Sequence, residues 1–132
     1  MAGTALGRFP LHLALGAKAV PQPEFTGEPS WYKDYEDRTA DDGAEGRLMT
    51  VHAFSSDWES WEMHPAGDEV VLCLSGEITL HQEYPDGRRE LLKLHSGEYV
   101  VNPPQVWHTA DIADQAEVLF ITAGAGTQQR TR

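Results

Sequence analysis

Four side chains that could together bind a metal ion lie in two short segments of this sequence: Glu62, His64 and Glu69 in the first and His108 in the second. Alternate side chains of a β-strand point to the same face of a sheet, so a strand through residues 60–64 would place Glu62 and His64 side by side. Glu69 follows a short turn and begins the next strand, close enough to converge on them. Two imidazoles and two carboxylates form a donor set that divalent transition metals accept.

The role of Glu62 and the identity of the metal stay open at this point. If Glu62 and Glu69 both bind, their two charges balance a divalent cation, and the added oxygen ligand favours a hard ion such as Mn²⁺ over Fe²⁺. If Glu62 does not bind, three ligands leave positions free for substrate or water, and Glu62 could act as a general base beside the metal. We expect a divalent ion of Mn, Fe, Zn or Ni.

These residues also have ordinary structural interpretations. Glutamates at strand ends are usually solvated, and a histidine after a tryptophan, as in Trp107-His108, is often a half-buried packing residue. Taken singly, such an interpretation outweighs a ligand role, but the combination at these spacings favours a metal site. Among the other residues, His52 and Phe54 share a strand face and could line the pocket, but packing in the core is the favoured interpretation. Cys73 is expected to be a small buried hydrophobe.

The chain after residue 46 has the pattern of short β-strands separated by turns. The expected strands cover residues 48–54, 60–64, 70–74, 78–84, 91–94, 99–101 and 118–122. Ser75-Gly76 is expected to turn the chain between two of them. Pro85-Asp86-Gly87 is expected to close a hairpin, because proline presets φ and glycine accepts the left-handed conformation. Turn signals at intervals of roughly 8–12 residues are typical of a β-sandwich or barrel, so the predicted fold class is all-β.

The first 45 residues differ from the rest, because prolines punctuate them and a polar, acidic stretch runs from Trp31 to Glu45. We expect residues 1–45 to form an N-terminal extension of loops, an edge strand and one short helix. The barrel would then cover residues 46–125, and residues 126–132 would form a C-terminal tail.

The two segments with the candidate ligands resemble the two cupin motifs, G-x5-H-x-H-x3,4-E-x6-G and G-x5-P-x-G-x2-H-x3-N. The resemblance extends over residues 56–112, and the matching residues are His64, Glu69, Gly76, Gly97, Pro103 and His108. Three departures concern turns and packing: Ser56, Gln105 and Ile112. The fourth departure concerns chemistry, because Glu62 stands where the motif has its first metal-binding histidine.

The resemblance implies a double-stranded β-helix, the jelly-roll barrel of the cupins, with a metal ion at its mouth. A metal-binding role carries over by position to His64, Glu69 and His108, and by inference to Glu62. Since one fold hosts many functions, two functions stay open. The first is a metal-dependent enzyme that acts on a small organic metabolite, of the dioxygenase, isomerase or lyase type. The second is a non-catalytic module that binds or senses a small molecule.

Composition narrows the choice of partners and compartment. A net charge of −11 repels the phosphates of nucleic acids and anionic membrane surfaces, so we expect neither as a partner. The single cysteine excludes an internal disulfide, and no apolar run approaches the roughly 20 residues that cross a bilayer. We therefore expect a cytoplasmic protein with a small-molecule ligand.

The sequence also indicates a homodimer. The apolar segment Phe9–Val20 has no expected partner inside the barrel, and jelly rolls have open sheet edges. Adding this segment to the sheet of a second copy would cover both the apolar segment and the open sheet edge in an isologous contact.

Overall fold

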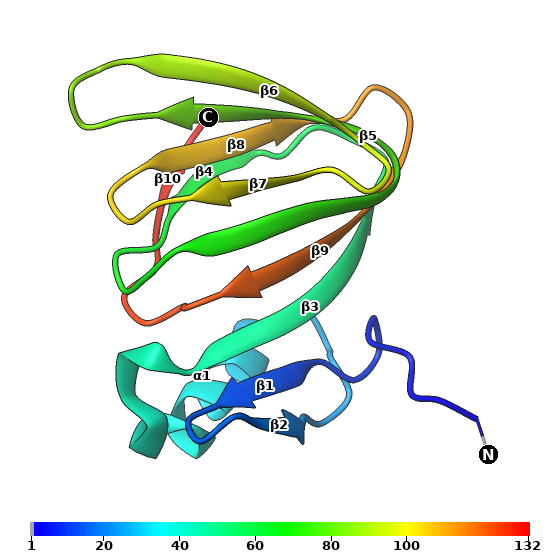
Figure 1. The fold of residues 1–132 in the computed structure, drawn as a ribbon, viewed down its shortest axis with the longest axis vertical. Helices are drawn as coiled ribbons and strands as arrows, with labels where there is room; N and C mark the ends of the chain where they lie inside the picture. The colour runs from blue at the N-terminus through cyan, green and yellow to red at the C-terminus, as the bar shows by residue number, and fades with distance from the viewer. Residues whose placement is uncertain (1) are drawn as a thin grey trace.

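The computed structural model describes residues 2–132 and is built mainly from antiparallel β-strands (Figure 1). The N-terminal part contains β1 (Leu11–Ala14), β2 (Lys18–Pro21), helix α1 (Pro29–Arg38) and the 3₁₀ helix η1 (Ala40–Glu45). The remaining strands are β3 (Arg47–Phe54), β4 (Ser60–Met63), β5 (Glu69–Glu83), β6 (Arg89–His95), β7 (Tyr99–Asn102), β8 (Trp107–Asp111), β9 (Ala116–Thr122) and β10 (Gln128–Thr131). Among the described residues, no helix is long and apolar enough to cross a membrane.

The strands form two layers that share the long strand β5. One layer pairs β2, β1, β3, β9, β5 and β7 in that order, and the other pairs β10, β4 and β8 with β5, which also pairs β6. This is the double-stranded β-helix that the motifs predicted, and the all-β fold class is confirmed. Figure 1 shows β5 passing from one layer to the other.

The predicted turn at Ser75-Gly76 is wrong, because β5 is continuous through these residues. The pairing of β5 with β9 shifts register between Cys73 and Ser75, so a bulge bends the strand instead of ending it. Gly76 adopts φ +77° and lies against the end of β9, where a Cβ atom would overlap the Gln115 carbonyl oxygen. Only glycine fits this position, and the bend lets one strand serve both layers.

The hydrophobic core lies between the two layers and is centred on β5. Val71, Cys73, Ile78, Leu80 and Val118 are fully buried there. Burying one such aliphatic side chain contributes about 1.5–3 kcal/mol, so this cluster is the main source of stability. Cys73 is buried and unbridged, as expected of a small hydrophobe.

The N-terminal extension packs onto its own chain. β1 pairs with β3, with Leu11 opposite Met49, so the premise that Phe9–Val20 has no partner inside the domain was wrong. Helix α1 begins at Pro29, and its Trp31 and Tyr35 form a second buried cluster with Leu48 of β3. The extension thereby lies below β3 in Figure 1.

Two strands outside the N-terminal extension were not expected from the sequence. β8 carries His108, and β10 lies within residues 126–132, the predicted C-terminal tail. β10 pairs with β4, with Gln129 opposite Glu62, and therefore forms part of the sheet that carries the candidate site.

Candidate metal centre

Three neighbouring strands position the candidate ligands. Glu62 is on β4, His64 directly follows that strand, Glu69 begins β5, and His108 is on β8. Glu62 and His108 are register partners across β4 and β8. The antiparallel pairing therefore brings residues from two distant segments to one end of the barrel.

The structure brings all four side chains together. The ring centroids of His64 and His108 are 5.1 Å apart. The Nε2 atoms of these rings lie 3.0 Å and 3.1 Å from the two carboxylate oxygens of Glu69, and Glu62 Oε2 lies 3.7 Å from His64 Nε2. One ligand atom each of Glu62, His64 and His108 lies within 4.8 Å of the others, a spacing that suits a shared metal ion.

Ring nitrogens of His64 and His108 are available to bind a metal ion. His64 Nε2 and both ring nitrogens of His108 are buried and have no hydrogen-bond partner among the described residues. The close contacts of the two Nε2 atoms with Glu69 are therefore short but not aligned as hydrogen bonds. Buried polar atoms are normally paired, so two unpaired imidazole nitrogens beside two carboxylates are what a cation site needs.

Thr127 sets the tautomer of His64. The Thr127 hydroxyl donates to the Gly124 carbonyl at 2.8 Å, so its oxygen accepts from His64 Nδ1, also at 2.8 Å. In the neutral imidazole the proton is therefore on Nδ1 and the lone pair is on Nε2, the atom nearest the carboxylates. A hydrogen bond on the far nitrogen is the usual way in which a protein orients a histidine ligand.

Glu69 is held from behind by neutral donors. Asn102 Nδ2 donates to Oε1 at 3.2 Å, and the Thr122 hydroxyl donates to Oε2 at 2.7 Å. Asn102 in turn accepts from Gln82 Nε2 at 2.8 Å, which continues the buried network along β5. These bonds fix both carboxylate oxygens, so Glu69 cannot turn away from the two imidazoles.

The two carboxyl groups differ in their proton affinity. Burial by itself would raise the pKa of Glu69, but the contacts with His108 and His64 outweigh it and hold the pKa well below the ordinary carboxyl value. Burial and the charge of Glu69 raise the pKa of Glu62, whose side chain is 32% exposed. Of the two carboxyl groups, Glu69 is therefore the weaker base and Glu62 the stronger.

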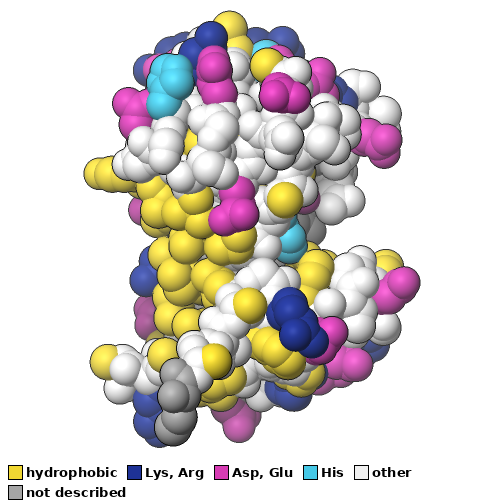
Figure 2. Space-filling model, turned by 90° about the vertical axis from the view of Figure 1, so that its right-hand side faces the viewer, with side chains coloured by type: hydrophobic (Ala, Val, Ile, Leu, Met, Phe, Trp, Pro, Cys, Tyr) yellow, Lys and Arg dark blue, Asp and Glu magenta, His cyan; other side chains and the backbone are white. Residues whose placement is uncertain are grey.

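A cavity of about 1170 Å³ opens in front of these residues, between the barrel and helix α1. Glu62, His64 and Glu69 line one part of it, and Tyr32 and Tyr35 of α1 line another. Figure 2 shows this face of the molecule hollowed between the barrel above and the N-terminal extension below, with a histidine side chain visible in the hollow. The extension thus forms one wall of the site.

Sequence reasoning missed part of this site. His52 and Phe54, for which core packing was the favoured interpretation, both line the cavity, although Phe54 also packs against the core. Thr127, which orients His64, lies in the segment set apart as a tail, and nothing in its sequence context marks it. Gln105, where the motif has glycine, adopts φ +68°, so the backbone keeps the left-handed conformation that the motif glycine provides.

Comparisons with known proteins identify relatives by structure alone. No protein-family model matches the chain, and no curated protein matches it. A solved oxalate oxidase superposes with a TM-score of 0.54 and 16% identity over 61% of this chain and 44% of its own. Hydroquinone 1,2-dioxygenase from Sphingomonas sp. TTNP3 has a TM-score of 0.51 and 17% identity over 58% of each chain. A cupin-2 domain protein from Shewanella frigidimarina has a TM-score of 0.48 and 20% identity over 57% of this chain and 68% of its own.

The fold and the site define a double-stranded β-helix with a buried Glu/His/His cluster at its open end. The structural neighbours are cupin proteins, and this chain has the cupin fold. The matches to the two enzymes span less than two thirds of their chains, so their activities are not transferred by the likeness.

Proposed function

We propose that this chain binds one divalent metal ion through His64, His108, Glu62 and Glu69 and acts as a metal-dependent enzyme on a small organic molecule. The observation that carries the proposal is the pair of buried Nε2 atoms of His64 and His108, which lack aligned hydrogen bonds and face carboxylate oxygens. A polar arrangement left unsatisfied in this way would cost stability, and a cation removes that cost.

The donor set favours an ion that accepts both imidazole and carboxylate. With Glu62 and Glu69 ionised, the two negative charges balance a divalent cation, as in sites for Mn²⁺ or Fe²⁺. Such an ion would act as a Lewis acid toward an oxygen atom of the substrate. The names of two structural neighbours, an oxidase and a dioxygenase, keep an oxidative reaction among the candidates beside isomerase and lyase chemistry.

Glu62 is the group best placed to move a proton. It lines the cavity, it is the most exposed of the four side chains, and its pKa is raised by burial and by Glu69. A carboxylate with a raised pKa is a stronger base than an ordinary glutamate. Glu62 therefore has two proposed roles, ligand and base, which variants can separate.

Metal analysis of protein purified without a histidine tag tests the proposal. We expect about one equivalent of a divalent metal per chain by inductively coupled plasma mass spectrometry. His64→Ala and His108→Ala should each lose it. The matched control is His95→Ala, because His95 is exposed and pairs with Glu98 away from the site. Wild-type protein that binds no divalent metal, or binds it equally after His64→Ala, would reject the proposal.

A bound metal does not by itself establish turnover. An enzyme would consume substrate or O₂ in the presence of the metal, whereas a sensing module would bind its ligand and return it unchanged. Product analysis on metal-loaded protein separates these two functions.

A further inference from the structure

One side of the cavity is a continuous series of aromatic rings, which we call the aromatic wall: Phe25, His52, Phe54, Trp58 and Phe120. Phe25 lies 5.2 Å from His52, and His52 lies 5.8 Å from Phe120, between ring centroids. Trp58 lies 5.5 Å from Phe54 and 6.0 Å from Phe120. These distances are those of interacting rings, so the wall is a connected apolar surface.

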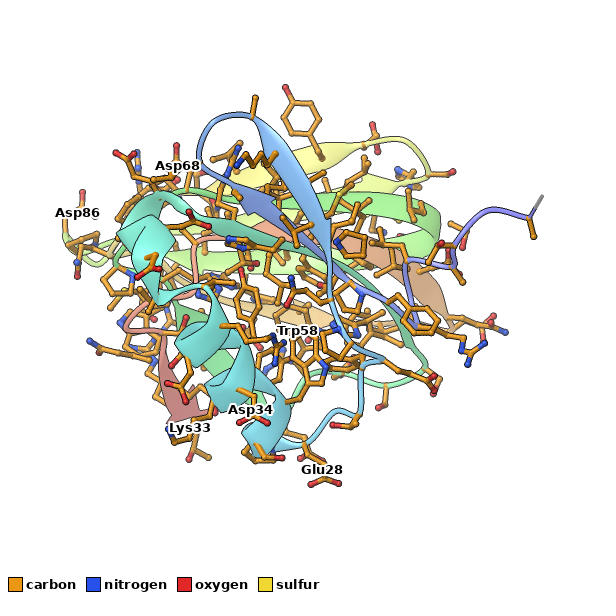
Figure 3. The ribbon with its side chains drawn as sticks, turned by 90° about the horizontal axis from the view of Figure 1, so that it is seen from below. Glu28, Lys33, Asp34, Trp58, Asp68 and Asp86 are labelled. Carbon is orange, nitrogen blue, oxygen red and sulfur yellow. The ribbon has the colours of Figure 1, made fainter. Side chains whose placement is uncertain are left out.

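The aromatic wall ends at the candidate metal centre. The ring of Trp58 lies 6.3 Å from that of His108. Figure 3 shows Trp58 among the crowded interior side chains, and Lys33 and Asp34 at helix α1. A molecule that packs against Trp58 at this end of the wall would therefore lie close to the metal centre.

The cavity is acidic and has no lysine or arginine among its lining residues. The carboxylates that line it are Glu36, Asp57, Glu59, Glu62 and Glu69. The cations of α1 are engaged elsewhere, because Lys33 pairs with Asp37 at the surface and Arg38 donates to Gln22. A carboxylate or phosphate ligand would meet like charges here and find no Lys or Arg partner.

Helix α1 supplies neutral polar groups to the opposite side. Tyr32 and Tyr35 both line the cavity, and burial raises the pKa of each phenol, so both hydroxyls stay protonated. Tyr35 is occupied with His12 at 2.6 Å, whereas Tyr32 lies near enough to Glu62 for that charge to raise its pKa further. Uncharged hydroxyls suit a ligand that carries hydroxyl or carbonyl groups.

We infer that the cavity binds an aromatic molecule without negative charge, with its ring on the aromatic wall and a polar substituent directed toward Glu62 and the metal centre. This inference names the substrate class of the proposed enzyme. It rests on the proposed function for the role of the metal, but the binding itself depends on the wall and on the charge of the cavity. A cavity of about 1170 Å³ has ample room for two fused rings.

Three probes of similar shape test the inference: 2-naphthol, naphthalene-2-carboxylate and decahydro-2-naphthol. Binding is measured by ligand-observed NMR titration, on protein as purified and on chelator-treated protein. In the metal-free protein we expect 2-naphthol to bind at least roughly tenfold more tightly than the carboxylate, because of charge. It should bind about fivefold more tightly than the saturated alcohol, because of ring stacking.

Variants locate the binding and separate it from the metal. Phe25→Leu keeps apolar volume but removes a ring from the wall, and should weaken 2-naphthol about fivefold. The control is Tyr99→Leu, because Tyr99 is an exposed ring outside the cavity. His64→Ala should lose the metal and still bind 2-naphthol. A wild-type protein that binds 2-naphthol but no metal would overturn the proposed function and leave this inference standing.

Three results would overturn the inference. The first is no binding of 2-naphthol at millimolar concentration. The second is equal affinity for the naphthoate, or for the saturated alcohol, in the metal-free protein. The third is an unchanged affinity in Phe25→Leu.

Discussion

The imidazole rings of His64 and His108 lie with their centroids 5.1 Å apart, and both face the single carboxylate of Glu69. His64 and Glu69 are only five residues apart in the sequence, whereas His108 comes from the distant strand β8. Because Asn102 and Thr122 hold both oxygens of Glu69, the arrangement is rigid from behind and open only toward the cavity. Substitutions of the residues that hold these side chains should therefore change the affinity for a metal ion.

Thr127→Val should weaken metal binding by about tenfold or more, because partners behind a ligand typically contribute that much. The variant removes the acceptor for His64 Nδ1 and leaves the ring free to change tautomer. Thr127→Ser keeps the hydroxyl and should restore most of the affinity. Competition with a chromogenic chelator measures the affinity, and ¹⁵N chemical shifts of His64 report the tautomer. A valine variant with wild-type affinity and tautomer would contradict the proposed role.

The variant Glu62→Gln tests whether Glu62 is a metal ligand or only a general base. If Glu62 is a ligand, loss of its charge should weaken metal binding by at least about tenfold, since even the loss of a residue that only hydrogen-bonds to a ligand costs that much. His64→Ala should abolish binding in the same assay. If Glu62→Gln leaves metal content and affinity unchanged while His64→Ala removes both, Glu62 is not a ligand, and only the general-base role is left to test.

Metal affinity should fall as pH decreases through the pKa of His64. Burial by itself lowers this pKa, but the contacts with Glu69 and the charge of Glu62 outweigh it and raise the pKa above its ordinary value of about 6.5. Protons compete with the metal for Nε2, so affinity should decrease by about tenfold per pH unit for each proton displaced. The decrease should already begin above pH ~6.5.

In the metal-free protein the same pKa shift acts on stability with the opposite sign. The protonated His64 stabilises the fold below about pH 6.5, and this contribution is lost as pH rises through the raised pKa. Urea unfolding and metal titration over one pH series check both signs. A metal affinity independent of pH between 6 and 8 would contradict the assignment of His64 as a ligand.

Gly76→Ala should be strongly destabilising, by about 3 kcal/mol or more, or prevent folding. The added Cβ would overlap the Gln115 carbonyl oxygen and would also face the left-handed φ. The matched control is Gly87→Ala, at φ +87° with no atom within 4 Å, which should cost about 1–2 kcal/mol from φ alone. Urea unfolding and soluble yield measure both variants. Equal costs would show that β5 and β9 do not approach closely at the bend.

The homodimer remains a prediction, and the structure changes the surface proposed for it. Strand β2 is the end strand of its layer, all four of its residues are exposed, and Val20 is 41% exposed. Pairing of two β2 edges about a two-fold axis would cover them. Val20→Glu is a sharper test than truncation, because removing residues 1–20 would also strip β1 from β3.

Light scattering at micromolar concentration should give a dimeric mass for the wild type and a monomeric mass for Val20→Glu. The control is Leu91→Glu on β6, at an exposed side chain outside this edge. A monomeric wild type would reject the dimer. A dimer that survives Val20→Glu would place the interface elsewhere.

The sequence by itself determined the local features of this protein. Strand parity placed Glu62 and His64 on one face, and the apolar run from Val70 to Leu74 predicted a buried strand. The Pro85-Asp86-Gly87 turn does connect β5 and β6, with Gly87 at φ +87°. Each of these depends on interactions between residues a few positions apart, and motif spacing then linked the two segments of the site.

Only the tertiary structure decided which distant segments meet. It joined 70–74 and 78–84 into one bent strand, paired β1 with β3, and placed β10 beside β4. These pairings depend on backbone hydrogen bonds and core packing between segments far apart in the chain, which no local pattern encodes. For the same reason the alignment of Thr127 behind His64, and the cavity between α1 and the aromatic wall, could be found only once the chain was folded.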